Sequence, residues 1–186
     1  GIDFIGHANY IDSEALDLLI ENKDRVYVGP AIAWEMAFLD NAEEMGYKND
    51  SREVIEYQKE LEETISSYKK MKEAGIKILV GGDYGLDIAP HGTYAKDLEH
   101  YVNLFGFSNA EALHSATSLG GEAMGNDGLL GTLEEGKLAD LVIIDGNPLE
   151  DITVLQNHKN IKAVMKDGLI YQGLTNKTNP YLNENL

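Results

Sequence analysis

The stretches Phe4-Ile5-Gly6-His7 and Val80-Gly81-Gly82-Asp83 decide the predicted fold. Each sets one side chain that can bind a metal at the C-terminal end of an apolar run typical of a strand. In parallel α/β folds, active sites lie at this edge of the sheet, because the βα loops open there and side chains already fill the strand interiors. We therefore predict an α/β protein in which His7 and Asp83 form part of a metal site.

Strands and helices alternate along the first two thirds of the chain. We expect strands at residues 2–5, 26–28 and 76–80, and helices at residues 13–22, 51–75, 94–105 and 108–116. Asp12 is expected to cap its helix, and Ser108 with Glu111 predicts a capping box. Residues 31–50 fit either a helical turn or a lid. The order predicts a parallel sheet with right-handed crossovers, in which 26–28 lies between the other two strands.

The pattern changes after residue 126. Residues 141–144 form a short apolar run, and the runs 161–165 and 169–171 flank Asp167-Gly168, which predicts a hairpin. These strands are expected to form a small β unit apart from the α/β layer. Residues 173–186 are rich in Asn and Thr and predict a poorly ordered tail.

Composition excludes several classes of function. The net charge of −17 over 186 residues argues against nucleic-acid binding, which needs clustered Lys and Arg. No apolar run approaches the length of a membrane span, so no membrane role is expected. The chain has no Cys, so any metal must be held by His and carboxylate groups. This is compatible with a reducing compartment, and we expect a cytoplasmic protein.

Three later segments carry a family resemblance. They are Gly131-Thr132-Leu133-Glu134-Glu135-Gly136-Lys137-Leu138-Ala139-Asp140-Leu141-Val142-Ile143-Ile144-Asp145, Pro90-His91-Gly92-Thr93 with Glu99, and Glu111-Ala112-Leu113-His114-Ser115-Ala116-Thr117. In order and spacing they resemble the amidohydrolase superfamily, in its imidazolonepropionase-like and metal-dependent dipeptidase branch. The resemblance implies a (β/α)8 TIM-type barrel with a β-sandwich. Residues 1–125 would then supply barrel strands six to eight, residues 126–172 the C-terminal share of the sandwich, and 173–186 a tail.

The resemblance also implies roles for the two strand-end residues. His7 corresponds to the metal-binding His of strand six, and Asp83 to the strand-eight carboxylate that binds metal and moves a proton. The implied cofactor is one or two divalent ions, with zinc the default for such ligands. The implied reaction is attack of hydroxide on an amide or cyclic amide C–N bond. The family's other ligands, on strands one, four and five, have no counterpart here. We therefore expect a fragment whose partner is the missing N-terminal half of the same barrel.

Each candidate also has a structural interpretation. His7 could be an ordinary hydrogen-bonded histidine, and Asp83 could be a turn residue or an N-cap. His91, Tyr84 and Trp34 are candidates for substrate binding, although a loop His and aromatic residues are as often structural. The histidines that we interpret as structural are His100, His114 and His158.

Two classes of function stay open, with a third disfavoured. The favoured one is a metal-dependent hydrolase acting on a small-molecule amide, an N-acyl amino acid or a dipeptide. The alternative is a non-catalytic relative that keeps the barrel as a scaffold. An independent small α/β binding domain would need a complete sheet within 186 residues, which the large apolar strand faces argue against. Unpaired outer strand edges would invite association, and a homo-oligomer is expected.

Overall fold

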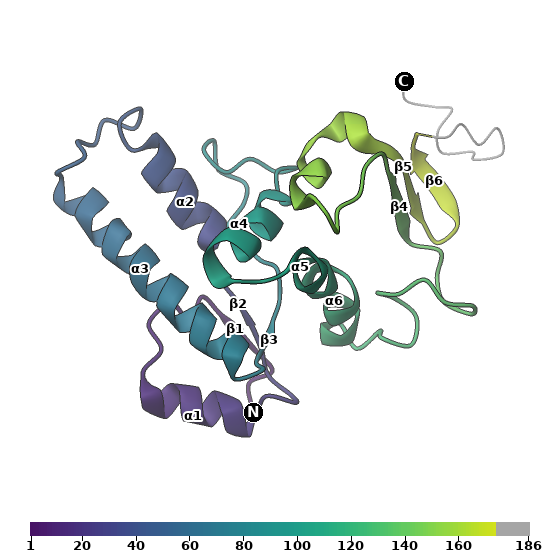
Figure 1. Cartoon of the computed structure of the whole chain (residues 1–186), viewed down its shortest axis with the longest axis horizontal. Helices are drawn as coiled ribbons and strands as arrows, with labels where there is room; N and C mark the ends of the chain where they lie inside the picture. The colour runs from purple at the N-terminus through teal and green to yellow at the C-terminus, as the bar shows by residue number, and fades with distance from the viewer. Residues whose placement is uncertain (174–186) are drawn as a thin grey trace. The chain divides into compact units, whose positions relative to one another are not determined.

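The computed structural model describes residues 1–173 and has two compact units, Gly1–Ala116 and Thr117–Leu186. Except for Gly173, the tail expected at 173–186 lies outside the described residues. The first unit alternates strands and helices as predicted (Figure 1). Its elements are β1 (Phe4–Gly6), α1 (Ser13–Glu21), β2 (Tyr27–Gly29), α2 (Ile32–Asn41), α3 (Arg52–Glu73), β3 (Lys77–Ile78), α4 (Lys96–Phe105) and α5 (Asn109–Ala116).

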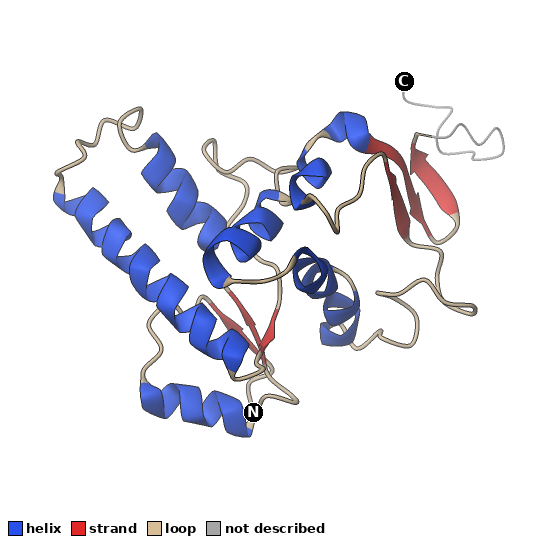
Figure 2. Ribbon diagram, in the orientation of Figure 1, coloured by secondary structure: helices blue, strands red, loops and turns tan. Residues whose placement is uncertain are grey.

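The sheet of the first unit is parallel, with the order β1-β2-β3 (Figure 2). Ile5 pairs with Val28, and Val28 pairs with Ile78. The predicted central place of the second strand is therefore confirmed. Because the three strands run in the same direction, the chain leaves β1 and β3 at the same edge of the sheet.

Strand β3 is shorter than the predicted span of residues 76–80. After Ile78, the Leu79 N–H still donates to the Val28 carbonyl at 2.8 Å, but the Leu79 carbonyl accepts from the Tyr101 hydroxyl at 2.6 Å. The Ile78 carbonyl accepts from the Ser115 hydroxyl. Side chains of α4 and α5 thus satisfy backbone groups that a longer ladder would use, and they fix where the chain turns away from the sheet.

The core of the first unit lies between the sheet and the helices α3 and α4. Val28 is fully buried in the sheet, together with Tyr68 and Met71 of α3. The Tyr68 ring stacks on Phe105 of α4 with a centroid distance of 4.9 Å. Burial of large apolar side chains of this kind contributes about 1.5–3 kcal/mol each. The three- and four-residue spacing that predicted α3 therefore marks a face that is buried.

The ambiguous segment 31–50 contains a regular helix, α2, over Ile32–Asn41. Phe38 of α2 packs on Tyr57 of α3 with ring centroids 4.2 Å apart, and Val54 completes this small cluster. Figure 1 shows α2 and α3 lying side by side. Tertiary contact with α3 therefore decides a helix that local sequence left open. No helix within residues 1–173 combines the length and apolar character needed to cross a membrane.

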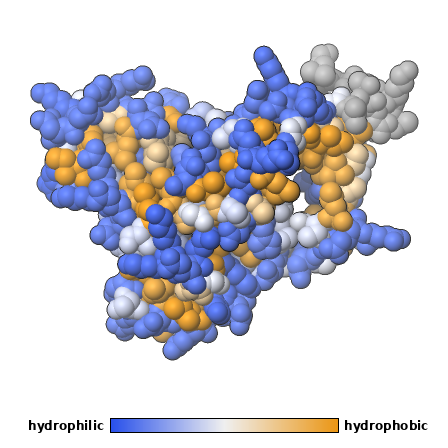
Figure 3. All heavy atoms as spheres, in the orientation of Figure 1, coloured by the Kyte–Doolittle hydropathy of each residue, from blue (hydrophilic) through white to orange (hydrophobic). Residues whose placement is uncertain are grey.

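The second unit begins with α6 (Ser118–Ala123) and contains an antiparallel sheet of β4 (Leu141–Ile144), β5 (Ile161–Lys166) and β6 (Leu169–Gln172). Two short 3-10 helices, Ile152–Gln156 and His158–Asn160, precede β5. The turn residues Asp167 and Gly168 have φ values of 49° and 75°, which confirms the predicted hairpin. Apolar side chains stay exposed on this sheet (Figure 3): Val142, Ile143, Leu169 and Tyr171. The division at residues 125 and 126 stays a prediction.

The first testable prediction concerns the cap of α1. The Asp12 side chain accepts a hydrogen bond from the Ala15 N–H at 2.8 Å, as the sequence predicted. Asp12→Ala should lower the free energy of unfolding by about 1 kcal/mol, because one N-terminal N–H loses its partner. Asp17→Ala, at an exposed position of the same helix, should change it by less than about 0.5 kcal/mol. Equal losses in urea denaturation of the two variants would contradict the capping role.

Candidate active site

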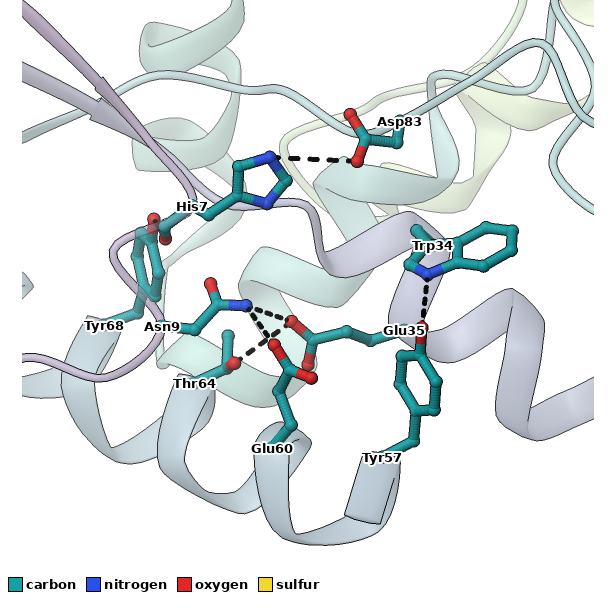
Figure 4. Close-up of polar contacts among 9 residues, drawn as sticks. All are labelled: His7, Asn9, Trp34, Glu35, Tyr57, Glu60, Thr64, Tyr68 and Asp83. Carbon is teal, nitrogen blue, oxygen red and sulfur yellow. Dashed lines mark hydrogen bonds and ion pairs between the residues drawn. The ribbon is translucent and has the colours of Figure 1, made fainter. Parts of the chain in front are cut away.

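His7 and Asp83 converge at the edge of the sheet where β1 and β3 end. The His7 Nε2 and Asp83 Oδ2 atoms are 3.8 Å apart (Figure 4). Both side chains are open to solvent, with exposed fractions of 56% and 59%. The two residues whose strand-end positions suggested a shared site are therefore neighbours, with reactive atoms that a small bound species can reach.

The chain turns sharply at His7. Both His7 and Ala8 have left-handed backbones, with φ values of 73° and 47°. Non-glycine residues adopt this conformation at an energetic cost and keep it only where surrounding contacts impose it. Here the His7 N–H donates to the Gly29 carbonyl at 2.8 Å, and the Tyr68 hydroxyl donates to the His7 carbonyl at 2.5 Å. Strand β2 and helix α3 thus hold the backbone of His7 from two sides.

Asn9 continues this turn into the interior. Its side-chain amide donates to the Glu35 carboxylate at 2.8 Å and to the Glu60 carboxylate at 3.0 Å. The Ser67 hydroxyl donates to the Asn9 carbonyl at 2.8 Å, and Thr64 donates to Glu35 at 3.1 Å. Figure 4 shows Asn9, Glu35, Glu60 and Thr64 gathered below His7. The loop after β1 is therefore attached to both α2 and α3.

Glu35 is a carboxyl group in an unusual environment. Only 1% of the residue is exposed, and its Oε2 atom has no hydrogen-bond partner. Burial raises the pKa of Glu35 to about 7, and the negative charge of Glu60 adds to the rise, while hydrogen bonds from Thr64 and Asn9 oppose it. The carboxyl group therefore changes charge near neutral pH, directly beneath the His7 turn.

A second buried carboxyl group supports the Asp83 loop. The Tyr84 hydroxyl donates to Asp97 of α4 at 2.9 Å, and Asp97 is fully buried. Burial raises the pKa of Asp97 to about 6, and the hydrogen bond from Tyr84 opposes this rise. Gly82 packs tightly here, since a Cβ atom at this position would lie 2.8 Å from side-chain atoms of both Ala33 and Tyr84. The backbone before Asp83 thus depends on a glycine.

An open cavity of about 370 Å³ is lined by Gly82 and Tyr84, the residues before and after Asp83 in the chain. Tyr84, His91, Tyr94 and Asp97 contribute to its wall. The His91 Nδ1 atom lies 2.6 Å from the Tyr94 hydroxyl, and the Tyr84 and Tyr94 rings meet edge to face at 4.6 Å. Two of the candidate substrate-binding residues, Tyr84 and His91, therefore border one cavity.

Trp34 lies in a different environment. Its indole N–H donates to the Tyr57 hydroxyl at 3.1 Å, and its ring lies near Phe38, so it takes part in the contact between α2 and α3. The structure does not place it in the cavity of Tyr84 and His91. Its predicted substrate role stays a prediction.

The remaining histidines lie on helices. His100 is on α4 and borders a smaller cavity of about 100 Å³, and burial lowers its pKa. His114 is on α5. His158 is in the second unit, in a short 3-10 helix.

The donor atoms of His7 and Asp83 fit a shared metal ion. An imidazole nitrogen and a carboxylate oxygen are zinc donors, and two such atoms on one tetrahedral ion at bonds of about 2.0–2.1 Å lie about 3.3 Å apart. The observed 3.8 Å needs only a small side-chain adjustment. A catalytic zinc takes about three protein ligands. Within residues 1–173, no group of three or more His, Cys, Asp or Glu could hold a metal.

Sequence reasoning missed the buried supports Asn9, Glu35 and Asp97. The available signal was a charged residue inside an apolar helical face. Asp97 lies four residues before Tyr101 and eight before Phe105, both of which are buried. Glu35 lies three residues before the buried Phe38. Such spacing indicates burial but not the partner, since Asn9 and Tyr84 lie on distant segments.

The raised pKa of Glu35 predicts a pH dependence of stability. Between pH 4.5 and 7, the unfolded chain releases this proton while the folded chain keeps it. The unfolded state then binds fewer protons, so stability falls as pH rises through this range, by on the order of 3 kcal/mol for this group. Glu35→Gln should remove this part of the slope, whereas Glu62→Gln, at an exposed position of α3, should keep it. Identical slopes for all three proteins in urea denaturation would contradict the assignment.

Comparisons with known proteins find enzymes that are similar to this chain in sequence and in structure. Ochratoxinase from Aspergillus niger is 32% identical over 174 residues, which are 93% of this chain and 34% of that protein. A Xaa-Pro dipeptidase with bound methionine in its active site matches with a TM-score of 0.73 at 35% identity, over 93% of this chain and 40% of that one. A prolidase complexed with N-methylphosphonate-L-proline matches with a TM-score of 0.78 at 28% identity, over 94% and 41%.

The chain thus spans about a third of the length of the Aspergillus protein and about two fifths of the two crystallised enzymes. The model of the amidohydrolase family matches residues 3–170, which is most of the sequence. This confirms the resemblance carried by the segments after Pro90. The chain belongs to the amidohydrolase family.

Proposed function

We propose that this chain is part of a metal-dependent amidohydrolase in which His7 and Asp83 bind a divalent ion, with zinc favoured by the donor set. The observation that carries the proposal is the convergence of the His7 Nε2 and Asp83 Oδ2 atoms at 3.8 Å, from the same ends of two strands in one parallel sheet. Membership of the amidohydrolase family supports it. The strained His7 backbone supports it as well, because such strain concentrates at functional sites.

In the proposed reaction, water attacks the carbonyl carbon of an amide. A divalent ion supplies Lewis-acid polarisation and lowers the pKa of water. The Asp83 carboxylate accepts the proton of the attacking water and delivers it to the leaving nitrogen as the C–N bond breaks. One C–O bond forms, one C–N bond breaks, and the proton ends on the amine. Asp83 suits this role because its side chain is exposed beside His7.

We further propose that β1, β2 and β3 are the sixth, seventh and eighth strands of a (β/α)8 barrel. Within residues 1–173 the outer edges of β1 and β3 have no strand partner. Apolar side chains of the first segment, Ile2 and Phe4, are exposed there. The remaining metal ligands would come from barrel strands outside this chain, which agrees with its share of the related proteins.

The substrate that this site supports best is a dipeptide or a comparable small amide. The names of the related Xaa-Pro dipeptidase and prolidase support a dipeptide, including one with a C-terminal proline. Tyr84 and His91 would contact the substrate from the cavity of about 370 Å³. A dipeptide is small enough for an opening of this size, and aromatic rings with a few polar atoms are typical of such pockets.

Substitution of the two site residues should separate metal binding from proton transfer. In the full natural chain, Asp83→Asn should lower kcat for dipeptide hydrolysis by at least about 100-fold, because the proton carrier is lost. His7→Ala should lower zinc occupancy as well, as measured by atomic absorption after dialysis. The controls are Asp87→Asn, in the same loop, and His158→Ala, both at exposed positions. Near-normal kcat for Asp83→Asn with metal bound would contradict the proton transfer proposed for Asp83. Absence of hydrolysis by the metal-loaded natural chain would favour the non-catalytic scaffold.

The chain of 186 residues alone should bind zinc weakly and hydrolyse no dipeptide. Its described part offers two converging ligands, fewer than a catalytic zinc site needs. Zinc titration against a chromogenic chelator measures the affinity, and a ninhydrin assay with Xaa-Pro and other dipeptides measures turnover. Stoichiometric, tightly held zinc together with turnover would contradict the division of ligands proposed above.

A further inference from the structure

We propose that Glu35 is a positioning residue for His7: through the Asn9 amide, its carboxyl group holds the left-handed turn at His7 and Ala8 and keeps the imidazole directed at Asp83. The inference deepens the proposed function, on which it rests for the role of His7. It concerns a residue that lies in the interior and whose hydrogen bonds come from Asn9 and Thr64 (Figure 4).

The first step of the argument is the cost of the turn. Two consecutive non-glycine residues with positive φ need outside support, since each is disfavoured in isolation. The backbone bonds from His7 to Gly29 and from Tyr68 to His7 fix the beginning of the turn. Its end is fixed by Asn9, which is only 7% exposed. A loose Asn9 would free the turn at one end.

The second step is the anchor of Asn9. Its side-chain amide spans two carboxylates, and Glu35 is the buried one, because Glu60 lies at a partly buried contact. A hydrogen bond to a desolvated acceptor in the protein interior is stronger than the same bond in water. Thr64 donates to the same Glu35 oxygen at 3.1 Å and fixes the direction of the carboxyl group. Helices α2 and α3 therefore meet at the point where the turn is held.

The third step is that packing does not require a carboxyl group at this position. Glu35 is 1% exposed, one of its oxygens has no partner, and desolvating such a group is costly. An apolar side chain would fit the burial better. The carboxyl group accepts hydrogen bonds from Thr64 and from Asn9, and Asn9 is two residues after His7.

A charge-swap experiment tests this connection. Asn9→Asp alone sets a third carboxylate against Glu35 and Glu60, whereas Asn9→Asp with Glu35→Gln restores one carboxylate–amide pair in reverse. In the full natural chain, Asn9→Asp should weaken zinc binding about tenfold or more. The double variant should recover at least about half of this loss on a logarithmic scale, because Glu60 still repels the new carboxylate. The control is a double variant that combines Asn9→Asp with Glu62→Gln, at an exposed position of α3. This control should recover none of the lost zinc affinity.

Amide hydrogen exchange of the metal-free protein gives a second readout that needs neither metal nor turnover. Asn9→Asp should speed exchange of the His7 N–H by about tenfold, and the double variant should slow it again, while the Leu79 N–H keeps its rate within about twofold. The Leu79 N–H donates to Val28 within the same sheet and so reports on global unfolding. If Asn9→Asp does not fold, Glu35→Ala decides, with His7 exchange rising at least about fivefold over that of Leu79.

The outcomes separate the two proposals. An equal loss of zinc affinity in Asn9→Asp with and without Glu35→Gln would overturn the role of Glu35. The same increase in hydrogen-exchange rate at the His7 and Leu79 N–H groups would also overturn it. Unchanged zinc affinity in His7→Ala would instead overturn the proposed metal role of His7. In that case the exchange rates alone decide whether Glu35 holds the turn.

Discussion

Parallel pairing of β1 and β3 on either side of β2 is the constraint on which the rest of the site depends. The register sets Ile5, Val28 and Ile78 in one row across the sheet. Because all three strands point the same way, the segments that follow β1 and β3 emerge at one edge, and His7 and Asp83 meet there. Reversal of either β1 or β3 alone would move one of these residues to the opposite edge of the sheet. The proximity of the two side chains is thus a consequence of topology.

Topology alone does not aim the side chains, and buried polar groups below the sheet edge do this locally. Asn9 and Glu35 lie beneath the His7 turn, and Tyr84 and Asp97 support the loop of Asp83. Both carboxyl groups are desolvated, and the pKa of each is raised, to about 7 for Glu35 and about 6 for Asp97. Groups of this kind lower stability near neutral pH. Such groups lie on both sides of the site. The protein therefore keeps loop geometry at the site at the expense of folding stability.

Most of the fold could be predicted from the sequence because its signals are local. The cap at Asp12, the apolar spacing of α3 and the turn at Asp167-Gly168 each depend on neighbouring residues, and each is found as expected. Helix α2 was ambiguous because its burial depends on contact between Phe38 and Tyr57, which belong to different helices. Strand β3 was predicted too long, since Tyr101 and Ser115 take up backbone carbonyls at its end.

The candidate site divides in the same way. His7 and Asp83 follow from their strand-end positions, and their meeting at 3.8 Å follows from parallel order. The supports Asn9, Glu35 and Asp97 could not be found, because each acts through a partner far along the chain. The metal roles of His7 and Asp83 remain a proposal. The most direct measurement is crystal diffraction at the zinc absorption edge on the full natural chain. The proposal predicts an anomalous peak about 2.0–2.2 Å from both His7 Nε2 and an Asp83 oxygen, and a zinc ion bound away from these two atoms would contradict it.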